Sequence, residues 1–416
     1  MYTRIEEGLA RCGMFGVRPG LGSIRAVCSK LGNPQDAVNV IHVAGTNGKG
    51  ATCALIESSL RAAGLSTGRY TSPHLVSLSE RFLLNGSPVA GHILDEVFAA
   101  MPEMGGLTYF ELLTAVAFQL YQREKVEWLV LETGLGGRLD ATNVVEKPKL
   151  CVITRIGLDH CDWLGRTLED IAREKGGIIK DGVPVVLGEM PKEARKVLEQ
   201  IASEHNAPCY YAPEEMTEMD IPKDMSLKGK FNRENALTAL TALKVLNVDK
   251  ESVARGFSSV VWNGRFQKID KGGKSYIVDG AHNPPAMQAL VDAIKEEVAQ
   301  RRFHCASAIC GFCGDKDVSA NLKLLREVVD SAIAVPIRNP RSLPADETAS
   351  LMRKAGFLDV KSCATLEEAL SICSDGTVVC GSLFLAGEAL EAFGVVDPCK
   401  GRFIPNESFV AGKNGI

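Results

Sequence analysis

The sequence predicts an α/β fold of two domains, each built on a parallel sheet with helical crossovers. Short apolar runs alternate with longer helical patterns along almost the whole chain, which is typical of parallel sheets. The alternation is broken between residues 255 and 275, where turn-forming residues replace any strong helix and indicate a linker. A chain of 416 residues also exceeds what one hydrophobic core usually organises. We therefore expect one domain over residues 1–262 and a smaller one over residues 263–416.

Hydrophobic periodicity gives the order of the elements. The first domain is predicted to contain a helix at residues 49–64, among other helical patterns, and strands at residues 37–45, 127–134, 149–157 and 183–188. The second is predicted to have a helix at about 285–299, further helices between its later strands, and strands within 275–280, 303–312, 331–337, 359–363 and 376–381. The polar stretch 398–416 is predicted to be a loosely held tail.

Composition excludes several classes of partner. Lysine and arginine number 47 against 51 acidic residues, with no basic arm or acidic tail, so a nucleic-acid partner is not expected. The N-terminus lacks a signal peptide, and no apolar run approaches the roughly 18 residues that span a bilayer. The 13 cysteines lie in apolar stretches and are predicted to be reduced. We expect a cytoplasmic protein without membrane partners, and a monomer.

A glycine-rich loop lies between the first predicted strand and helix, in the sequence VAGTNGKGATC. Its glycines allow a tight turn whose amides converge on an anion, and its lysine supplies a cation for the outer phosphates. The residues expected to contact a nucleotide are Gly45, Thr46, Asn47, Gly48, Lys49 and Gly50. The usual pattern ends GK[ST], whereas a glycine follows the lysine here, so a strand-to-helix turn without a ligand is the alternative. We predict a P-loop parallel-sheet ATPase domain followed by a Rossmann-like α/β domain.

Seven further stretches occur with this loop in one order: YTSPHLVSLSERF, LETGLGGRLDATN, RIGLDHCDWLG, IAREKGGIIK, FNRENALTAL, WNGRFQ and VDGAHNPPAM. Together they resemble the folylpolyglutamate synthase and dihydrofolate synthase family, relatives of the Mur ligases. The resemblance covers residues from about 16 to about 390. It implies that the first domain is of the Mur ligase central type and that the second is a glutamate ligase domain.

The resemblance also implies a reaction. ATP would activate a carboxylate as an acyl phosphate, and the amino group of L-glutamate would attack it to form an amide. The implied small molecules are ATP, L-glutamate and folate or dihydropteroate, with Mg²⁺, expected as two ions, and a monovalent cation. Whether one or both folate reactions occur stays open. The alternatives are another Mur-type amide ligase, or a nucleotide-binding regulatory protein that has lost turnover.

The family's metal-binding pattern maps onto Ser72, Glu132 and His160. A hydroxyl, a carboxylate and an imidazole suit Mg²⁺ or Mn²⁺. Glu132 and His160 fall at or just beyond the carboxyl ends of predicted strands, where ligands of open parallel sheets collect. The alternatives are a helix cap for Ser72, a strand-end salt bridge for Glu132 and a satisfied loop histidine for His160.

Lys175 matches a lysine that is carbamylated in this family, which would make it an anion able to help hold a second metal. The modification needs a neutral amine, favoured by burial and nearby cations. The alternative is an exposed lysine paired with an acidic residue one helical turn away. The residues expected to be catalytic are Lys175, Lys49, His282 and Asp279.

Four residues are expected around the nucleotide and the catalytic centre. Asn235 would lie toward the base, Arg265 toward the phosphates, and Asp279 and His282 near the ribose and the reacting groups. The alternatives are an ordinary exposed helix residue for Asn235 and a capping aspartate in a strand-end turn for Asp279 and His282. On this reading neither domain holds a complete site, so closure about a hinge near residues 258–268 is expected.

For the pterin-bearing substrate, the resemblance points to Phe110 and Glu111, where a flat ring could stack on an aromatic side chain. Arg81 could meet an anionic substrate tail. Plain core packing for Phe110 and a surface ion pair for Arg81 are the alternatives.

One feature of the sequence departs from the family pattern, and another resembles a zinc-binding motif without completing it. Ala51 stands where the family loop usually has serine or threonine, so nucleotide affinity is expected to be weaker unless Thr52 supplies the hydroxyl. Cys310 and Cys313 have a C-x-x-C spacing but no second ligand pair at zinc spacing, and they are interpreted as part of a strand-end loop.

Overall fold

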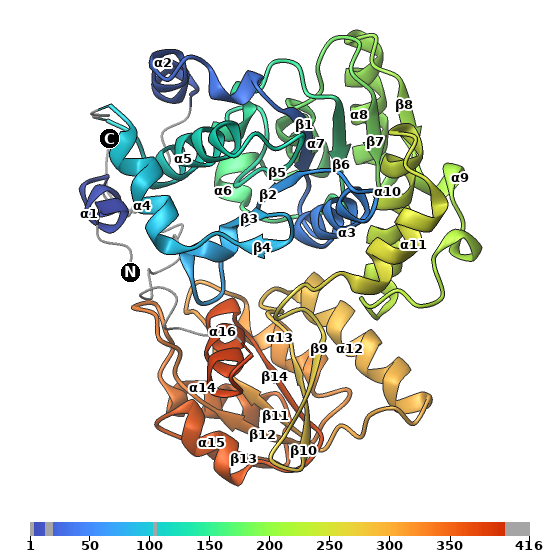
Figure 1. Cartoon of the computed structure of the whole chain (residues 1–416). Helices are drawn as coiled ribbons and strands as arrows, with labels where there is room; N and C mark the ends of the chain where they lie inside the picture. Colours follow the sequence, from blue (N-terminus) through green and yellow to red (C-terminus); the bar gives the residue numbers. More distant parts are fainter. Residues whose placement is uncertain (1–3, 13–19, 103–105, 396–416) are drawn as a thin grey trace. The chain divides into compact units, whose positions relative to one another are not determined.

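The computed structural model describes residues 4–12, 20–102 and 106–395, and it divides into two compact units (Figure 1). The chain passes from the first unit to the second between Val261 and Trp262. Leu227–Phe231 also belongs to the second unit, although it precedes this break. The predicted tail at 398–416 lies outside the described residues.

The first unit contains an eight-stranded sheet in the order β4-β3-β2-β5-β1-β6-β7-β8. The strands from β2 to β8 in this order pair in parallel, and β3 and β4 continue the sheet antiparallel. All four strands predicted for this domain are present. The strands are β1 (Asn39–Ala44), β2 (Thr67–Tyr70), β3 (Phe82–Leu84), β4 (Ser87–Pro88), β5 (Trp128–Glu132), β6 (Leu150–Ile153), β7 (Val185–Leu187) and β8 (Cys209–Tyr211).

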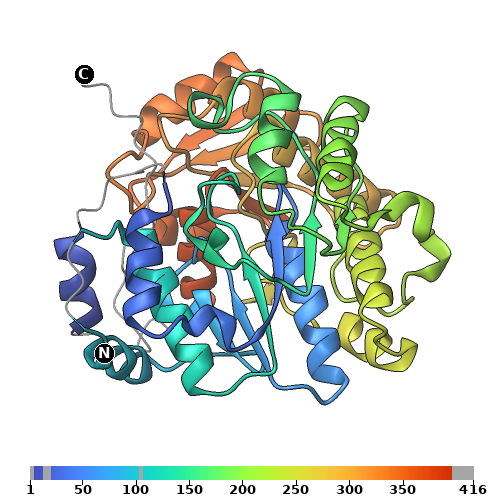
Figure 2. The ribbon, with the colours of Figure 1, turned by 90° about the horizontal axis from the view of Figure 1, so that it is seen from above.

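Helices flank both faces of this sheet (Figure 2). α3 packs against β2 and β5, and α11 lies along α3. The α-helices are α1 (Arg4–Arg11), α2 (Gly22–Lys30), α3 (Lys49–Ala62), α4 (Gly91–Ala100), α5 (Tyr109–Arg123), α6 (Cys161–Leu164), α7 (Leu168–Gly176), α8 (Lys192–Glu204), α9 (Ala212–Glu215), α10 (Lys230–Val245) and α11 (Lys250–Ser259). The short 3-10 turns are η1 (Pro34–Asp36), η2 (Leu78–Arg81), η3 (Ala141–Val144) and η4 (Glu218–Asp220). No helix in the described part of the chain is long and apolar enough to cross a membrane.

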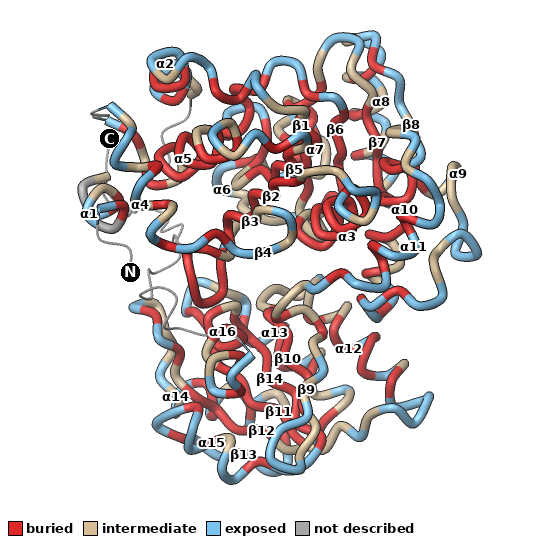
Figure 3. Tube along the Cα trace, viewed as in Figure 1, coloured by how far each residue is buried: buried red, intermediate tan, exposed pale blue. Residues whose placement is uncertain are grey.

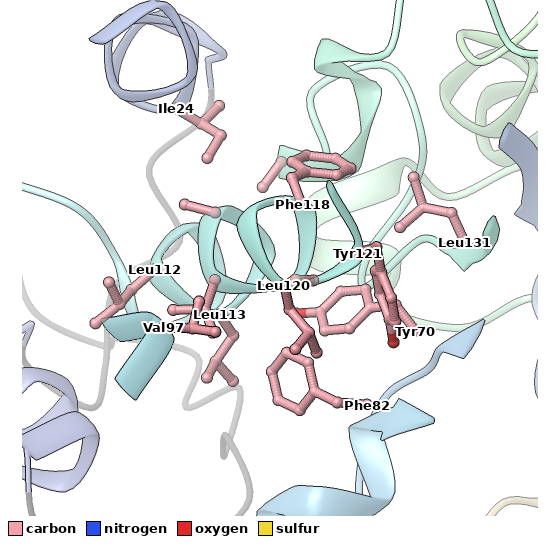
Figure 4. Packing of buried hydrophobic residues seen from close by; sticks show 14 of the residues in the cluster. Ile24, Tyr70, Phe82, Val97, Leu112, Leu113, Phe118, Leu120, Tyr121 and Leu131 are labelled. Carbon is pink, nitrogen blue, oxygen red and sulfur yellow. The ribbon is translucent and has the colours of Figure 1, made fainter. Parts of the chain in front are cut away.

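The largest core cluster of this unit forms where α5 meets the sheet. Phe118 and Tyr121 of α5 pack with Tyr70 and Phe82 of the strands (Figure 4). Each fully buried side chain of this size contributes roughly 1.5–3 kcal/mol to folding. The Tyr121 hydroxyl also donates to the Arg69 carbonyl at 2.7 Å, which ties α5 to β2. The central strands and α3 are buried along most of their length (Figure 3), so the loops at their carboxyl ends rest on a rigid base.

The second unit contains a six-stranded sheet in the order β13-β12-β11-β14-β10-β9. β9 is antiparallel to β10, and the other neighbours are parallel. The five strands predicted for this domain are all present, and β9 adds a sixth. The elements are β9 (Gln267–Lys271), β10 (Lys274–Val278), α12 (Pro284–Ala299), β11 (Ser307–Cys310), α13 (Val318–Leu325), β12 (Ser331–Ala334), α14 (Ala345–Lys354), β13 (Asp359–Ser362), α15 (Leu366–Ile372), β14 (Thr377–Cys380) and α16 (Leu383–Ala392).

The predicted linker at 255–275 is wrong over most of its length. α11 continues to Ser259, and β9 forms a hairpin with β10. Within this range, only residues 260–266 and the two-residue turn at 272–273 lie outside helices and strands. The sequence pattern missed β9 because an edge strand exposes most of its side chains, so QKIDK carries little apolar signal.

Candidate active site

The glycine-rich loop at residues 45–48 joins β1 to α3 and is held by the loop that follows β6. The Thr46 hydroxyl accepts from the Gly157 amide at 3.0 Å and lies 3.1 Å from the Gly157 carbonyl. The Thr154 hydroxyl donates to the Asn47 carbonyl at 2.8 Å. Gly48 stands before α3 with φ 87°, a left-handed conformation that glycine adopts readily. The loop is therefore fixed from its side, and the amino end of α3 supports its backbone.

Two lysines converge on one carbonyl of this loop. Lys49 Nζ donates to the Gly45 carbonyl at 3.1 Å, and Lys175 Nζ, from α7, donates to the same oxygen at 2.8 Å. Lys175 is 4% exposed. Its burial, with a smaller effect from the Lys49 charge, lowers the pKa of Lys175 to about 7. The alternative of an exposed, ion-paired Lys175 is therefore wrong.

Glu132 ends β5 and joins this group. Its Oε1 lies 3.9 Å from Lys49 Nζ, and its Oε2 accepts from the Ser72 amide at 3.1 Å. Ser72 lies in the loop after β2 and caps no helix, because η2 begins at Leu78 with Ser77 as its cap. The helix-cap alternative for Ser72 is therefore wrong. The structure brings together a hydroxyl residue, a buried carboxylate and two amines.

His160 lies in the loop after β6, at the same edge of the sheet. It has a left-handed φ of 50° and directly precedes α6. Its ring is half-buried, with Nε2 4.0 Å from Asp159 Oδ1. Among the described residues, no group of three or more His, Cys, Asp or Glu side chains could by itself hold a metal ion. A metal here would need further oxygen ligands from Ser72, water or a bound phosphate.

Asn235 of α10 lies against the glycine-rich loop. It is 8% exposed, and its Oδ1 would be 2.1 Å from a Cβ built on Gly48. The neighbouring Glu234 pairs with Arg155 at 2.6 Å, beside the loop. The alternative of an ordinary exposed helix residue is therefore wrong for Asn235, since its amide is buried beside the loop.

The predicted substrate residues lie at the start of α5 and in η2. The Phe110 ring is half-buried, 6.0 Å from the Tyr70 ring. Glu111 forms a capping box with Thr108, accepting from the Thr108 amide at 2.8 Å. This bond commits one carboxylate oxygen of Glu111 to the start of the helix.

Arg81 is fully buried, so the surface ion-pair alternative is wrong. Its Nε donates to His74 Nδ1 at 2.9 Å, and its guanidinium lies 5.6 Å from the centre of the Tyr109 ring. These contacts hold the loop that carries Ser72 against the start of α5.

The second unit holds its predicted residues in the loop after β10. Asp279 accepts from the amides of Phe266 and Ala281, each at 2.7 Å. Burial raises the pKa of Asp279, and the nearby Arg265 opposes that shift. Asp279 holds the turn, but the cap of α12 is Asn283, which accepts from a backbone amide at 2.9 Å. The alternative of a capping aspartate in a strand-end turn therefore describes the local role of Asp279, which does not cap a helix.

His282 follows in the same loop and is half-buried. Its Nδ1 lies 2.8 Å from the Gly280 carbonyl. A carbonyl only accepts, so the proton is on Nδ1 and Nε2 is the acceptor nitrogen of the ring. Asn321 of α13, fully buried, donates to the His282 carbonyl at 3.1 Å.

Comparison with known proteins identifies the family. The Mur ligase middle domain matches residues 43–243, and the glutamate ligase domain of the Mur ligases matches residues 264–382. A Bacillus subtilis dihydrofolate synthase/folylpolyglutamate synthase is 34% identical over 417 residues, covering 90% of this chain and 95% of that protein. The chain belongs to the folylpolyglutamate synthase/dihydrofolate synthase family.

Solved structures of the folylpolyglutamate synthase/dihydrofolate synthase family have the same fold. Escherichia coli FolC in complex with DHPP and ADP has a TM-score of 0.83 at 30% identity, covering 94% of this chain and 98% of that one. The bifunctional Yersinia pestis enzyme complexed with AMPPNP and an Mn ion has a TM-score of 0.80 at 30% identity, with the same coverage. Both the predicted family and the predicted fold of two parallel-sheet domains are confirmed.

Sequence reasoning missed the residues that hold the family's nucleotide loop in place. Thr154 and Gly157 are more than 100 positions from the loop residues they bind. The only signal was their place at the carboxyl end of the predicted strand 149–157. Asn321 was missed because it lies on a separate helix, 39 positions from the His282 carbonyl that it binds. Cys310 ends β11 and Cys313 lies just beyond it, so the C-x-x-C spacing belongs to a strand-end loop as expected.

Proposed function

We propose that this chain is an ATP-dependent ligase that adds L-glutamate to folates, to dihydropteroate or to both, through an acyl phosphate. One observation carries the proposal. In a member of this family, a glycine-rich loop, two lysines and the buried Glu132 meet at the carboxyl edge of a parallel sheet. The relatives crystallised with ADP, AMPPNP and DHPP support nucleotide and pterin-type ligands at such a site.

The glycine-rich loop would bind the triphosphate. Its backbone amides and the amino end of α3 favour negative charge. Lys49 is the flexible cation, because its present partners are loop carbonyls at 3.1 and 3.3 Å that it can exchange for phosphate oxygens. Phosphoryl transfer depends mainly on positioning and on offsetting negative charge. We assign both tasks to this loop and to Lys49.

The side chains beside the loop fit a hard divalent cation. Glu132 and Ser72 offer oxygen atoms within one cluster, and Mg²⁺ commonly takes one or two carboxylates together with phosphate oxygens and water. Glu132, Ser72 and His160 would hold the ion, which would offset charge between the phosphate and the carboxylate. The Mn ion in the Yersinia pestis relative supports a divalent metal.

Lys175 suits carbamylation because its environment favours the neutral amine. A neutral Nζ attacks CO₂ and loses a proton, leaving a carbamate anion. The buried position and the pKa of about 7 support this assignment for Lys175. The two-ion count, the monovalent cation, the monomeric state and the cytoplasmic location stay predictions.

In the second unit, His282 is the candidate proton acceptor. L-Glutamate must lose an ammonium proton before its nitrogen attacks the acyl phosphate, and the Nε2 atom of His282 is the basic atom of its ring. Asp279 positions this loop through its two backbone hydrogen bonds. We assign Arg265 and Asn235 to the nucleotide, as the family pattern implies.

The test is turnover by the full chain. We expect ADP release that requires L-glutamate, Mg²⁺ and either tetrahydrofolate or dihydropteroate, with a product heavier by one glutamyl residue in mass spectrometry. Lys49→Met should lower turnover about 100-fold or more. Lys323→Met, at an exposed position on α13, is the matched control and should retain activity. ADP binding without acceptor-dependent ADP release would favour the regulatory alternative instead.

A further inference from the structure

Three buried polar side chains are linked by hydrogen bonds below the loop that follows β5. None of them has a role in the reaction proposed above. His42 of β1 is fully buried, and its Nε2 lies 2.8 Å from the Thr142 hydroxyl of η3. That hydroxyl lies 2.5 Å from Asp140 Oδ1. These hydrogen bonds join the centre of the sheet to the end of the loop at residues 133–140.

The hydrogen bonds among these three side chains run in one direction, from His42 through Thr142 to Asp140. Asp140 accepts from the Thr142 amide at 3.0 Å and from the Leu135 amide at 2.8 Å. Burial raises the pKa of Asp140, and hydrogen bonds from Thr142, Leu135 and Gly134 oppose that rise. The Thr142 hydroxyl donates its single proton to Asp140 Oδ1. His42 must then donate to Thr142 through Nε2–H.

The other nitrogen of His42 shows that the ring is more than core filling. Nδ1 is buried and has no hydrogen-bond partner among the described residues. Burial, with a smaller effect from Lys180, lowers the pKa of His42 to about 3, so the ring is neutral. A leucine here would fill the core without leaving a buried polar atom unpaired. The specific contribution of His42 is therefore its Nε2–H.

Asp140 fixes a loop that borders three residues of the candidate site. The loop begins directly after Glu132. On one side, a Cβ on Gly134 would lie 2.7 Å from Phe110 Cζ, so the loop backbone touches that ring. On the other, the Arg138 amide donates to the Glu174 carbonyl at 2.7 Å, one residue before Lys175. By accepting from Leu135, Asp140 holds the two ends of the loop together.

We propose that His42 and Thr142 are positioning residues for the acceptor substrate, acting through Asp140 to hold the loop at residues 133–140 against Phe110. The proposal rests on the proposed function, since it assigns the pterin-bearing acceptor to the Phe110 side of this loop. The nucleotide loop has separate supports in Thr154 and Gly157. Loss of the hydrogen bonds among His42, Thr142 and Asp140 should therefore weaken binding of the acceptor substrate and leave nucleotide affinity unchanged.

Thr142→Val tests the proposal, because valine keeps the shape of threonine and removes the hydroxyl. We expect the KM for tetrahydrofolate or dihydropteroate to rise about tenfold, the loss typical of one hydrogen bond to a charged group. The dissociation constant of ADP should stay within about twofold, a change that costs little free energy. Backbone amides at residues 133–140 should exchange hydrogen faster. Thr142→Ser keeps the hydroxyl, and His42→Gln keeps an N–H donor. Both variants should therefore have a KM for the acceptor close to that of the wild type.

The matched control is Thr348→Val in α14, a fully buried threonine whose hydroxyl has no hydrogen-bond partner among the described residues. It should leave both constants unchanged. The positioning role is overturned if Thr142→Val leaves the acceptor KM unchanged while wild type turns over. Equal losses of ADP and acceptor binding, or a Thr142→Ser variant as impaired as Thr142→Val, also overturn it. If wild type releases no ADP with either acceptor, the proposed function itself fails, and this proposal with it.

Discussion

Gly48→Ala should weaken both the fold and nucleotide binding, for two separable reasons. Gly48 has φ 87°, and a side chain in that left-handed region costs about 1–2 kcal/mol. The new Cβ would also lie 2.1 Å from Asn235 Oδ1. Because Asn235 is buried, relief of this overlap should cost a further 1–3 kcal/mol or so. We expect the free energy of unfolding to fall by about 2–5 kcal/mol in total.

Urea unfolding and ADP titration measure the two effects, and a double-mutant cycle separates the two causes. Asn235→Ala removes the overlapping atom, so Gly48→Ala should cost only the backbone part, about 1–2 kcal/mol, in that background. ADP affinity of the single Gly48→Ala variant should fall about tenfold or more, because the loop amides that we assign to the phosphates would shift. Equal costs of Gly48→Ala in both backgrounds would refute the contact between the loop and α10. Unchanged ADP affinity would refute the role of the loop.

Three further predictions concern titration and the altered loop. The wild-type free energy of unfolding should rise with pH by about 1 kcal/mol per unit between pH 8 and 9, because Lys175 has a lowered pKa in the fold and binds a proton again on unfolding; in Lys175→Met, urea unfolding should show that this slope is lost. Burial raises the pKa of Glu297, but hydrogen bonds from Arg302 and Lys268 outweigh it and leave the pKa lowered. Its contribution should be present at neutral pH and be lost as the pH falls through that lowered pKa, so Glu297→Gln should cost about 1–3 kcal/mol at pH 7 and less at pH 3 in the same assay. Ala51→Thr restores a hydroxyl in the first turn of α3 and should tighten Mg²⁺–ADP binding about tenfold by calorimetry, whereas unchanged affinity would show that the hydroxyl has no role.

The sequence predicted the strands of both sheets well where both faces of a strand are covered. LCVI in β6 and VVC in β14 are continuous apolar runs because helices lie on both sides of a parallel sheet. Among the edge strands, β4, β8 and β9 escaped prediction, whereas β13 was predicted. QKIDK of β9 and the two-residue β4 carry too little apolar signal to separate them from a loop.

The candidate site divides in the same way. Motif order, through the family resemblance that it carries, was enough to single out Lys49, Glu132 and Lys175. The environment of each side chain was beyond the sequence. Arg81 and Asn235 were open to surface readings, yet both are buried. Burial is set by which elements pack over a residue, and those elements are distant in the chain.

The sequence by itself determined the family, the parallel-sheet architecture and the residue types predicted to bind phosphate and metal, because alternation, glycine spacing and motif order are local properties of the chain. Only the tertiary structure decided that two lysines share the Gly45 carbonyl, that Asn235 contacts Gly48 and that His42 supports Asp140. The contacts of Lys175 with Gly45, of Asn235 with Gly48 and of His42 with Thr142 each join residues 100 or more positions apart. Their formation follows from packing of the folded core, which no single stretch of sequence records.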